Sequence, residues 1–177
     1  DRDTGDLAGT ATSGDMFGAS LASGNFNGDG DPVSQLPCDD LAIGTPGLDV
    51  NSQDNAGGAF VLFGGSNSLE TSFDNPGGRV WTQARSQING QPEPNDRVGE
   101  AVAAFDFGGD FVDDLLIGAP FDEFAGQFGA VHLIPGAAGS EFMDQANSLF
   151  FSASTVTTPG LTYRGFGAAL ATGIDYT

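Results

Sequence analysis

The chain has 177 residues, of which 24 are acidic and five basic, giving a formal net charge of −19. Such a surface repels polyanions, which excludes a nucleic-acid partner, and no apolar run is long enough to span a bilayer, so we expect no membrane insertion. Hydrophobic residues make up 39% and include 15 Phe, which predicts a packed core rather than a disordered acidic tail.

An internal repeat begins with a turn that ends in Gly. Residues 14–18 recur as 95–99 and again as 163–167, and small apolar residues follow each copy. Self-similarity at a fixed period is typical of repeat architectures. The turn therefore predicts repeat units of approximately 14–94, 95–162 and an incomplete 163–177.

Two later landmarks recur in the same order. Residues 40–46 match 114–120 at an offset of 74, and residues 58–65 match 129–136 at an offset of 71. Landmarks that keep their order while the offsets drift slightly indicate a supersecondary unit of roughly 70 residues with insertions in its loops.

Short strands are the elements expected in each unit. The expected strands are 41–43, 60–63 and 79–83 in the first unit, and 115–117, 131–134 and 148–151 in the second. No segment keeps helical periodicity over a dozen positions, so helices should be scarce. The fold class is therefore all-β, with β-propeller blades of four short antiparallel strands: two blades and the start of a third.

These landmarks resemble the FG-GAP repeat, which is named for Phe-Gly and Gly-Ala-Pro and is best known from the propeller of integrin α-subunits. The matching residues are Phe17-Gly18 with Gly44-Thr45-Pro46, Val98-Gly99 with Gly118-Ala119-Pro120, and Phe166-Gly167. The chain is closest in character to bacterial secreted members. The resemblance implies that residues 1–177 are one segment of a larger propeller, completed by further blades of a longer chain or by other copies.

Two acidic loops resemble the calcium loops of this family. Hard cations such as Ca²⁺ bind several oxygen ligands, which a tight loop with oxygen side chains at alternate positions supplies. By this resemblance, the first loop offers the side chains of Asn25, Asn27, Asp29 and Asp40 with the carbonyl of Asp31, and the second offers the side chains of Asp106, Asp110 and Asp114 with the carbonyl of Val112. Ca²⁺ is the expected cofactor.

Both loops depart from the family pattern. Nine residues separate Gly30 from Asp40 where the family has two, which leaves Asp39 or Asp31 as alternative ligands. In the second loop Gly108 removes one ligand and Phe111 replaces the turn glycine. The alternative interpretation is a solvated turn with local hydrogen bonds. An EF-hand is excluded, because the twelfth position lacks Glu and no helices are expected nearby.

Catalysis is not expected. The single histidine, His132, lies in an expected strand, at its edge or on a blade face, and no nucleophile motif accompanies it. The single cysteine, Cys38, is interpreted as an inert thiol. Three aromatics, Phe121, Phe124 and Phe128, are expected in an acidic loop that either binds a partner or covers the blade.

The sequence thus predicts an exported calcium-binding β-propeller scaffold for adhesion or protein interaction. Its location would be extracellular, either secreted or at the cell surface, and its ligand a protein or a glycan. Two alternatives remain open: an accessory propeller domain of a secreted hydrolase, and a structural subunit of an extracellular assembly.

Overall fold

The structure is a computed structural model, and it describes residues 12–30, 36–65, 78–85, 88–139, 143, 147–156 and 164–173. The regular elements of these residues are almost entirely β. They are β1 (Ser20–Gly24), β2 (Asp40–Thr45), β3 (Gly58–Leu62), β4 (Gly78–Trp81), β5 (Ala101–Phe105), β6 (Asp114–Phe124), β7 (Gln127–Ile134), β8 (Leu149–Ser152) and the single helical turn α1 (Ala153–Val156). Among the described residues, no helix is long and apolar enough to cross a membrane.

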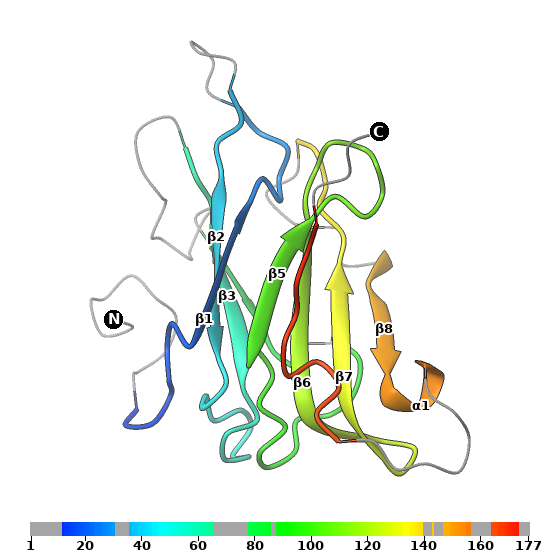
Figure 1. The fold of residues 1–177 in the computed structure, drawn as a ribbon. Helices are drawn as coiled ribbons and strands as arrows, with labels where there is room; N and C mark the ends of the chain where they lie inside the picture. Colours follow the sequence, from blue (N-terminus) through cyan, green and yellow to red (C-terminus); the bar gives the residue numbers. More distant parts are fainter. Residues whose placement is uncertain are drawn as a thin grey trace.

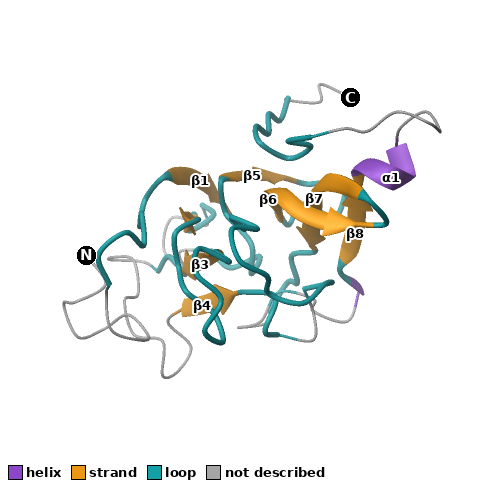
Figure 2. Ribbon diagram, turned by 90° about the horizontal axis from the view of Figure 1, so that it is seen from below, coloured by secondary structure: helices purple, strands orange, loops and turns teal. Residues whose placement is uncertain are grey.

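The strands form two antiparallel sheets of four, and each strand pairs with the next one in the chain. The first sheet has the order β1-β2-β3-β4 and the second the order β5-β6-β7-β8. Strands β1 and β5 lie side by side, whereas β4 and β8 are far apart, so the sheets fan out from their first strands (Figures 1 and 2). The predicted all-β class is confirmed, and the arrangement is that of blades in a partial propeller.

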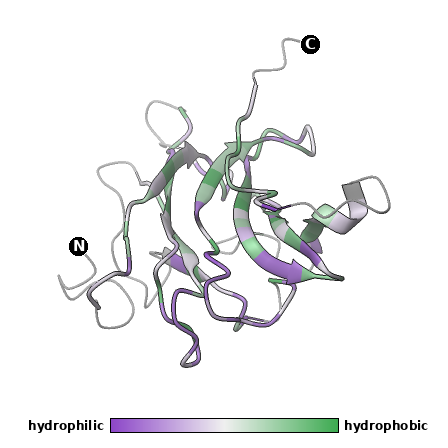
Figure 3. Ribbon diagram, turned by 60° about the horizontal axis from the view of Figure 1, so that its bottom comes forward, coloured by the Kyte–Doolittle hydropathy of each residue, from purple (hydrophilic) through white to green (hydrophobic). Residues whose placement is uncertain are grey.

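The main hydrophobic core lies between the two sheets. Its fully buried members come from both: Phe26, Ala42, Ala59, Val61 and Trp81 from the first, and Val98, Leu115, Ile117, Ala119, Ala130 and Ile134 from the second repeat. Hydrophobic colouring follows the strands, while the loops below the sheets are mostly hydrophilic (Figure 3). Burial of apolar surface between blades therefore joins the two sheets.

The repeated turn has the same backbone in its copies. Met16 and Arg97 occupy equivalent positions and both have positive φ, 57° and 56°; the glycines that close the turn, Gly18, Gly99 and Gly167, have φ of 86°, 85° and 85°. L-residues with side chains rarely adopt this conformation, and glycine does so without strain. The three copies predicted from sequence are thus the same turn.

The closing glycines of the second and third turns pack directly on the preceding sheet. A Cβ on Gly99 would lie 2.1 Å from the carbonyl oxygen of Gly58, and one on Gly167 would lie 2.3 Å from that of Ala130. No side chain fits at such an approach of backbone to backbone. The start of the third copy therefore docks on the second sheet as the second copy docks on the first.

The predicted offset of 71 between the third strands is wrong by one residue. Gly57 forms a parallel bridge with Val98, and Gly129 forms the same bridge with Phe166. These two glycines are therefore equivalent, which makes the offset 72. The error arose because each run begins with several small residues that align equally well in either register.

A shift of one residue exchanges the two faces of a strand. In the first sheet Phe60 pairs with Ile43, and in the second His132 pairs with Ile117. His132 thus takes the place of Phe60 on the buried face, where its ring packs 5.3 Å from that of Phe150. Burial lowers the pKa of His132 to about 4, so the ring is neutral at pH 7.

The region after Gly118-Ala119-Pro120 is a hairpin rather than the expected loop. Strand β6 continues to Phe124 and turns back into β7 through Ala125 and Gly126, whose φ values are 53° and 75°. Two consecutive residues of positive φ match the twist of the flanking strands. Phe124 packs edge-on against Phe150 at 5.2 Å, which anchors the hairpin to β8.

Candidate functional site

The two acidic loops occupy equivalent places in the two sheets. Loop one (residues 25–39) joins β1 to β2, and loop two (residues 106–113) joins β5 to β6. Both lie at the upper end of the sheets in Figure 1. The structure therefore brings the predicted ligands of each loop to the same end of neighbouring blades.

Asp40 fastens loop one to its own sheet. Its Oδ2 accepts a hydrogen bond from the backbone N–H of Phe26 at 2.7 Å, and its Oδ1 accepts one from that of Gly64 at 2.7 Å. The side chain is buried, and this burial, with the nearby charge of Asp29, raises the pKa of Asp40 to about 7 although the N–H donors oppose the rise. The backbone N–H donors therefore do not fully offset the cost of burying the negative charge of Asp40.

Asp114 makes the same contacts in the second sheet. Its Oδ2 accepts from the N–H of Phe107 and its Oδ1 from that of Gly136, both at 2.8 Å. Burial raises its pKa, and the charges of Asp110 and Asp106 add to the rise. The repeat therefore preserves a carboxylate that joins the loop to the second residue after the third strand.

Loop one contains two buried oxygens without a hydrogen-bond partner among the described residues. Asn25 donates from Nδ2 to the carbonyl oxygen of Asp29 at 2.7 Å, and Asn27 donates from Nδ2 to Asp29 Oδ2 at 3.1 Å. The remaining oxygens, Asn25 Oδ1 and Asp29 Oδ1, are the unpaired ones. Buried polar atoms are normally paired, and a cation with oxygen ligands would satisfy both. The donor set of loop one thus fits a hard cation.

The long excursion in loop one closes on itself. Gly30 and Pro37 form an antiparallel bridge, which returns the chain to the loop before β2 begins. Of the residues considered as alternative ligands, Asp39 is exposed, and Asp31 lies outside the described residues. Asp40 directly follows this excursion, and its carboxylate accepts a hydrogen bond from the backbone N–H of Phe26 in loop one.

Loop two has the contacts of a solvated turn. Asp106 Oδ1 accepts from the N–H groups of Gly109 and Asp110, Asp106 Oδ2 accepts from that of Phe111, and Asp110 Oδ1 accepts from that of Val112. Phe111 is 94% exposed. No unpaired buried oxygen occurs among the described residues of this loop. Nowhere among the described residues do three or more Asp, Glu, His or Cys side chains form a group that could hold a metal ion.

Loop one also contacts loops of the second repeat. The backbone N–H of Asn25 donates to Asp113 Oδ2 at 2.9 Å, and the N–H of Asp113 donates back to the carbonyl of Asn25 at 3.0 Å. Two further backbone bonds run from Ala137 to Phe26 and from Gly139 to Asn27. These hydrogen bonds couple the conformation of loop one to the junction between the two sheets.

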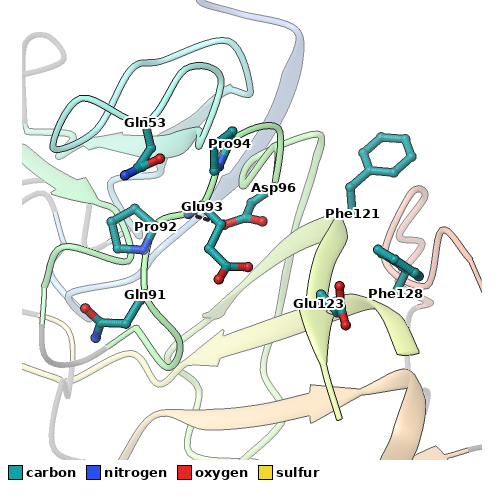
Figure 4. Close-up of a pocket in the computed structure, with 9 residues that line it drawn as sticks. All are labelled: Gln53, Gln91, Pro92, Glu93, Pro94, Asp96, Phe121, Glu123 and Phe128. Atoms are coloured by element: carbon teal, nitrogen blue, oxygen red, sulfur yellow. Dashed lines mark hydrogen bonds between the residues drawn. The ribbon is translucent and has the colours of Figure 1, made fainter. Parts of the chain in front are cut away.

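A pocket of about 470 Å³ lies at the opposite end of the sheets. Its walls come from the first sheet's β2–β3 connection, from residues 91–96, and from the β6–β7 hairpin (Figure 4). Behind it, Gln83 Nε2 donates to Asp122 Oδ2 at 3.0 Å. Sequence reasoning noticed the hairpin aromatics but missed the pocket, because its other walls are distant in the chain.

The pocket is strongly acidic. Burial, together with the charges of Asp96 and Glu93, raises the pKa of Asp122 to about 7. Burial likewise raises the pKa of Asp96 to about 6, although Asp96 accepts a hydrogen bond from the N–H of Glu93. Several partly desolvated carboxylates therefore share one site.

One comparison with known proteins gives a match. The family model of the FG-GAP repeat matches residues 98–134, which run from the second turn to the end of β7. No curated protein matches the chain. The matched segment contains loop two and the hairpin that walls the pocket.

Proposed function

Because residues 98–134 match the FG-GAP repeat family and the chain forms propeller-type sheets, we propose that it is an exported, calcium-binding scaffold for adhesion or other protein interaction. FG-GAP repeats are generally non-catalytic, propeller-type interaction domains and are typical of extracellular proteins. The observation that supports calcium most directly is the pair of unpaired buried oxygens in loop one.

Loop one would hold the ion through Asn25 Oδ1, Asp29 Oδ1 and the carboxylate of Asp40, with Asn27 close by. A bound cation would supply positive charge among these oxygens and would lower the repulsion between Asp29 and Asp40. The residues themselves fix the loop to β2 and to loop two. Calcium would therefore strengthen the junction between blades as well as the loop.

The extracellular location follows from the expected affinity. Extracellular calcium modules bind near 10⁻⁴ to 10⁻³ M, which requires a calcium-rich medium. The net charge of −19 also favours retention of divalent cations over polyanions. We propose secretion or surface display on these grounds, with a protein or a glycan as ligand.

A structural subunit of a larger assembly is the second candidate. Gly167 and Phe166 already occupy the docking position on the second sheet, where a following blade would begin. Further blades, from the same longer chain or from other copies, would continue from that point. The accessory domain of a secreted hydrolase is the third candidate, and a catalytic domain in a longer precursor would favour it.

Thermal unfolding tests the calcium proposal. With a dissociation constant of about 10⁻⁴ M, 10 mM calcium should stabilise the fold by about 2.7 kcal/mol relative to chelator. For a chain of this size that corresponds to about 5–10 °C. Asp29→Ala should abolish most of the shift, whereas the exposed Asp54→Ala should retain it.

Loop two is tested by the same measurement. Asp110→Ala should leave most of the calcium shift in place, because loop two lacks unpaired buried oxygens. An unchanged midpoint in the wild-type chain with calcium and with chelator would contradict the metal proposal.

A further inference from the structure

The pocket between the sheets combines carboxylates with aromatic walls. Glu93, Asp96 and Glu123 line it, and Phe121 and Phe128 form one side (Figure 4). Its lining contains no Lys or Arg. A concave site of this size with a few convergent polar groups is typical of ligand binding.

Two arginine side chains of the protein already lie near the aromatic side of the pocket. The Cζ of Arg97 lies 6.0 Å from the ring centre of Phe121, and that of Arg164 lies 4.5 Å from the ring centre of Phe128. Arg97 is also paired with Glu100 at 2.8 Å, so its charge is directed to that carboxylate. Both rings therefore already lie within cation–π distance of a planar cation.

A buried acceptor lies behind the same wall. Gln83 is 3% exposed, and its Oε1 has no hydrogen-bond partner among the described residues. Its Nε2 bonds to Asp122 and lies against Gly90, the neighbour of the pocket-lining Gln91. Gln83 is not a lining residue, so it holds Asp122 behind the pocket wall instead of contacting a ligand itself.

We propose that this pocket binds the guanidinium group of an arginine side chain presented by a protein partner. The proposal rests on the interaction role proposed above and names its partner chemistry, but it does not require the calcium loops. Guanidinium is planar, weakly hydrated and forked, so it stacks on an aromatic ring while donating to carboxylates. A metal ion fits less well, because no three described carboxylates converge as ligands.

A bound guanidinium group would stabilise the charged form of the carboxylates at the pocket. Burial is the main cause of the raised pKa of Asp96 and of Asp122; the charge of Glu93 adds to both, and the charge of Asp96 adds to the rise at Asp122. A cation held between the lining carboxylates and the rings lowers the repulsion among these charges, and binding should weaken as salt is added.

Calorimetric titration of the whole chain tests this, with a capped Gly-Arg-Gly peptide as the probe. The matched peptide contains citrulline, which keeps the shape of arginine and lacks its charge. We expect the arginine peptide to bind at least fivefold more tightly than the citrulline peptide. Equal binding of the two, or no binding of either, would overturn the proposal.

Variants locate the binding and separate the possible sources of the cation. Glu93→Gln with Glu123→Gln should weaken binding of the arginine peptide at least fivefold, whereas Asp110→Asn, at the opposite end of the sheets, should not change it. Unchanged affinity in the double variant counts against the pocket. Methylguanidinium should bind more weakly than the peptide, and equal affinity would indicate a free small cation instead of a protein partner.

A folding control accompanies each variant. The thermal unfolding midpoint of Glu93→Gln with Glu123→Gln should stay close to that of the wild-type chain, which shows that the sheets remain intact. Loss of the calcium shift in the wild-type chain with retained peptide binding would refute only the metal proposal. The reverse result would refute only the pocket.

Discussion

Single residues determine how one repeat packs against the next. Gly99 has a φ of 85°, and a Cβ added to it would lie 2.1 Å from the carbonyl oxygen of Gly58. The sequence predicted the recurring Gly but not the reason, since the contact lies on the preceding sheet. The Phe-Gly landmark is thus explained by contact between blades as well as by local turn geometry.

Gly99→Ala should destabilise the fold by more than about 3 kcal/mol, because strain and a backbone clash act together. Gly126 is the matched control: its φ is 75°, but nothing lies within 4 Å of its missing Cβ. Gly126→Ala should cost only about 1 kcal/mol, from strain alone. Urea unfolding gives both values, and equal losses would contradict this explanation.

The predicted metal ligands have different positions in the structure. Asp40 and Asp114 were expected from the resemblance to the family's calcium loops, and the structure places both beside their loops as acceptors of backbone N–H groups. Their burial depends on the third strand of each sheet, which begins 18 residues after Asp40 and 13 residues after Asp114. The resemblance therefore located the carboxylates but not their desolvation.

At the scale of elements, the β6–β7 hairpin distinguishes the second sheet from the first. It brings Asp122 to Gln83, a residue just beyond β4 of the first sheet. The corresponding connection in the first sheet contains only the isolated bridge between Val50 and Gln53. An extended hairpin in one repeat thus creates a buried carboxylate that the other repeat lacks.

Asp122 should make the stability depend on pH. Its folded pKa of about 7 exceeds the usual unfolded value near 3.9, so the folded state binds an extra proton between these pH values. This contribution is complete below about pH 4 and disappears as pH rises to about 7, at up to roughly 1.4 kcal/mol per pH unit.

Asp122→Asn isolates this term. Relative to the wild type, the variant should gain stability steadily from pH 4 to pH 7 in denaturant unfolding. At pH 4 both side chains are neutral, so the difference there measures the packing of the amide alone. Parallel pH profiles of the two proteins would show that Asp122 is not protonated on folding.

At the scale of the whole molecule, the two sheets share one core. Trp81 of the first sheet and Leu115 of the second are both fully buried in it. Because the same apolar contacts serve both sheets, we expect the described blades to unfold as one cooperative unit.

Leu115→Ala tests this cooperativity through the fluorescence of the single tryptophan. The substitution should destabilise the fold by about 2–5 kcal/mol and shift the Trp81 transition by that full amount, although it lies in the other sheet. Leu149→Ala, at a position 46% exposed, should shift the transition very little. A Trp81 transition unaffected by Leu115→Ala would show that the sheets unfold independently.

The sequence alone determined the repeated turn, the all-β class and the positions of both acidic loops, because each of these depends on residues that are neighbours in the chain. Tertiary structure decided the register that puts His132 in the place of Phe60, the unpaired oxygens of Asn25 and Asp29, and the acidic pocket. These features depend on which distant segments come together and exclude water. Burial and desolvation arise only from that assembly.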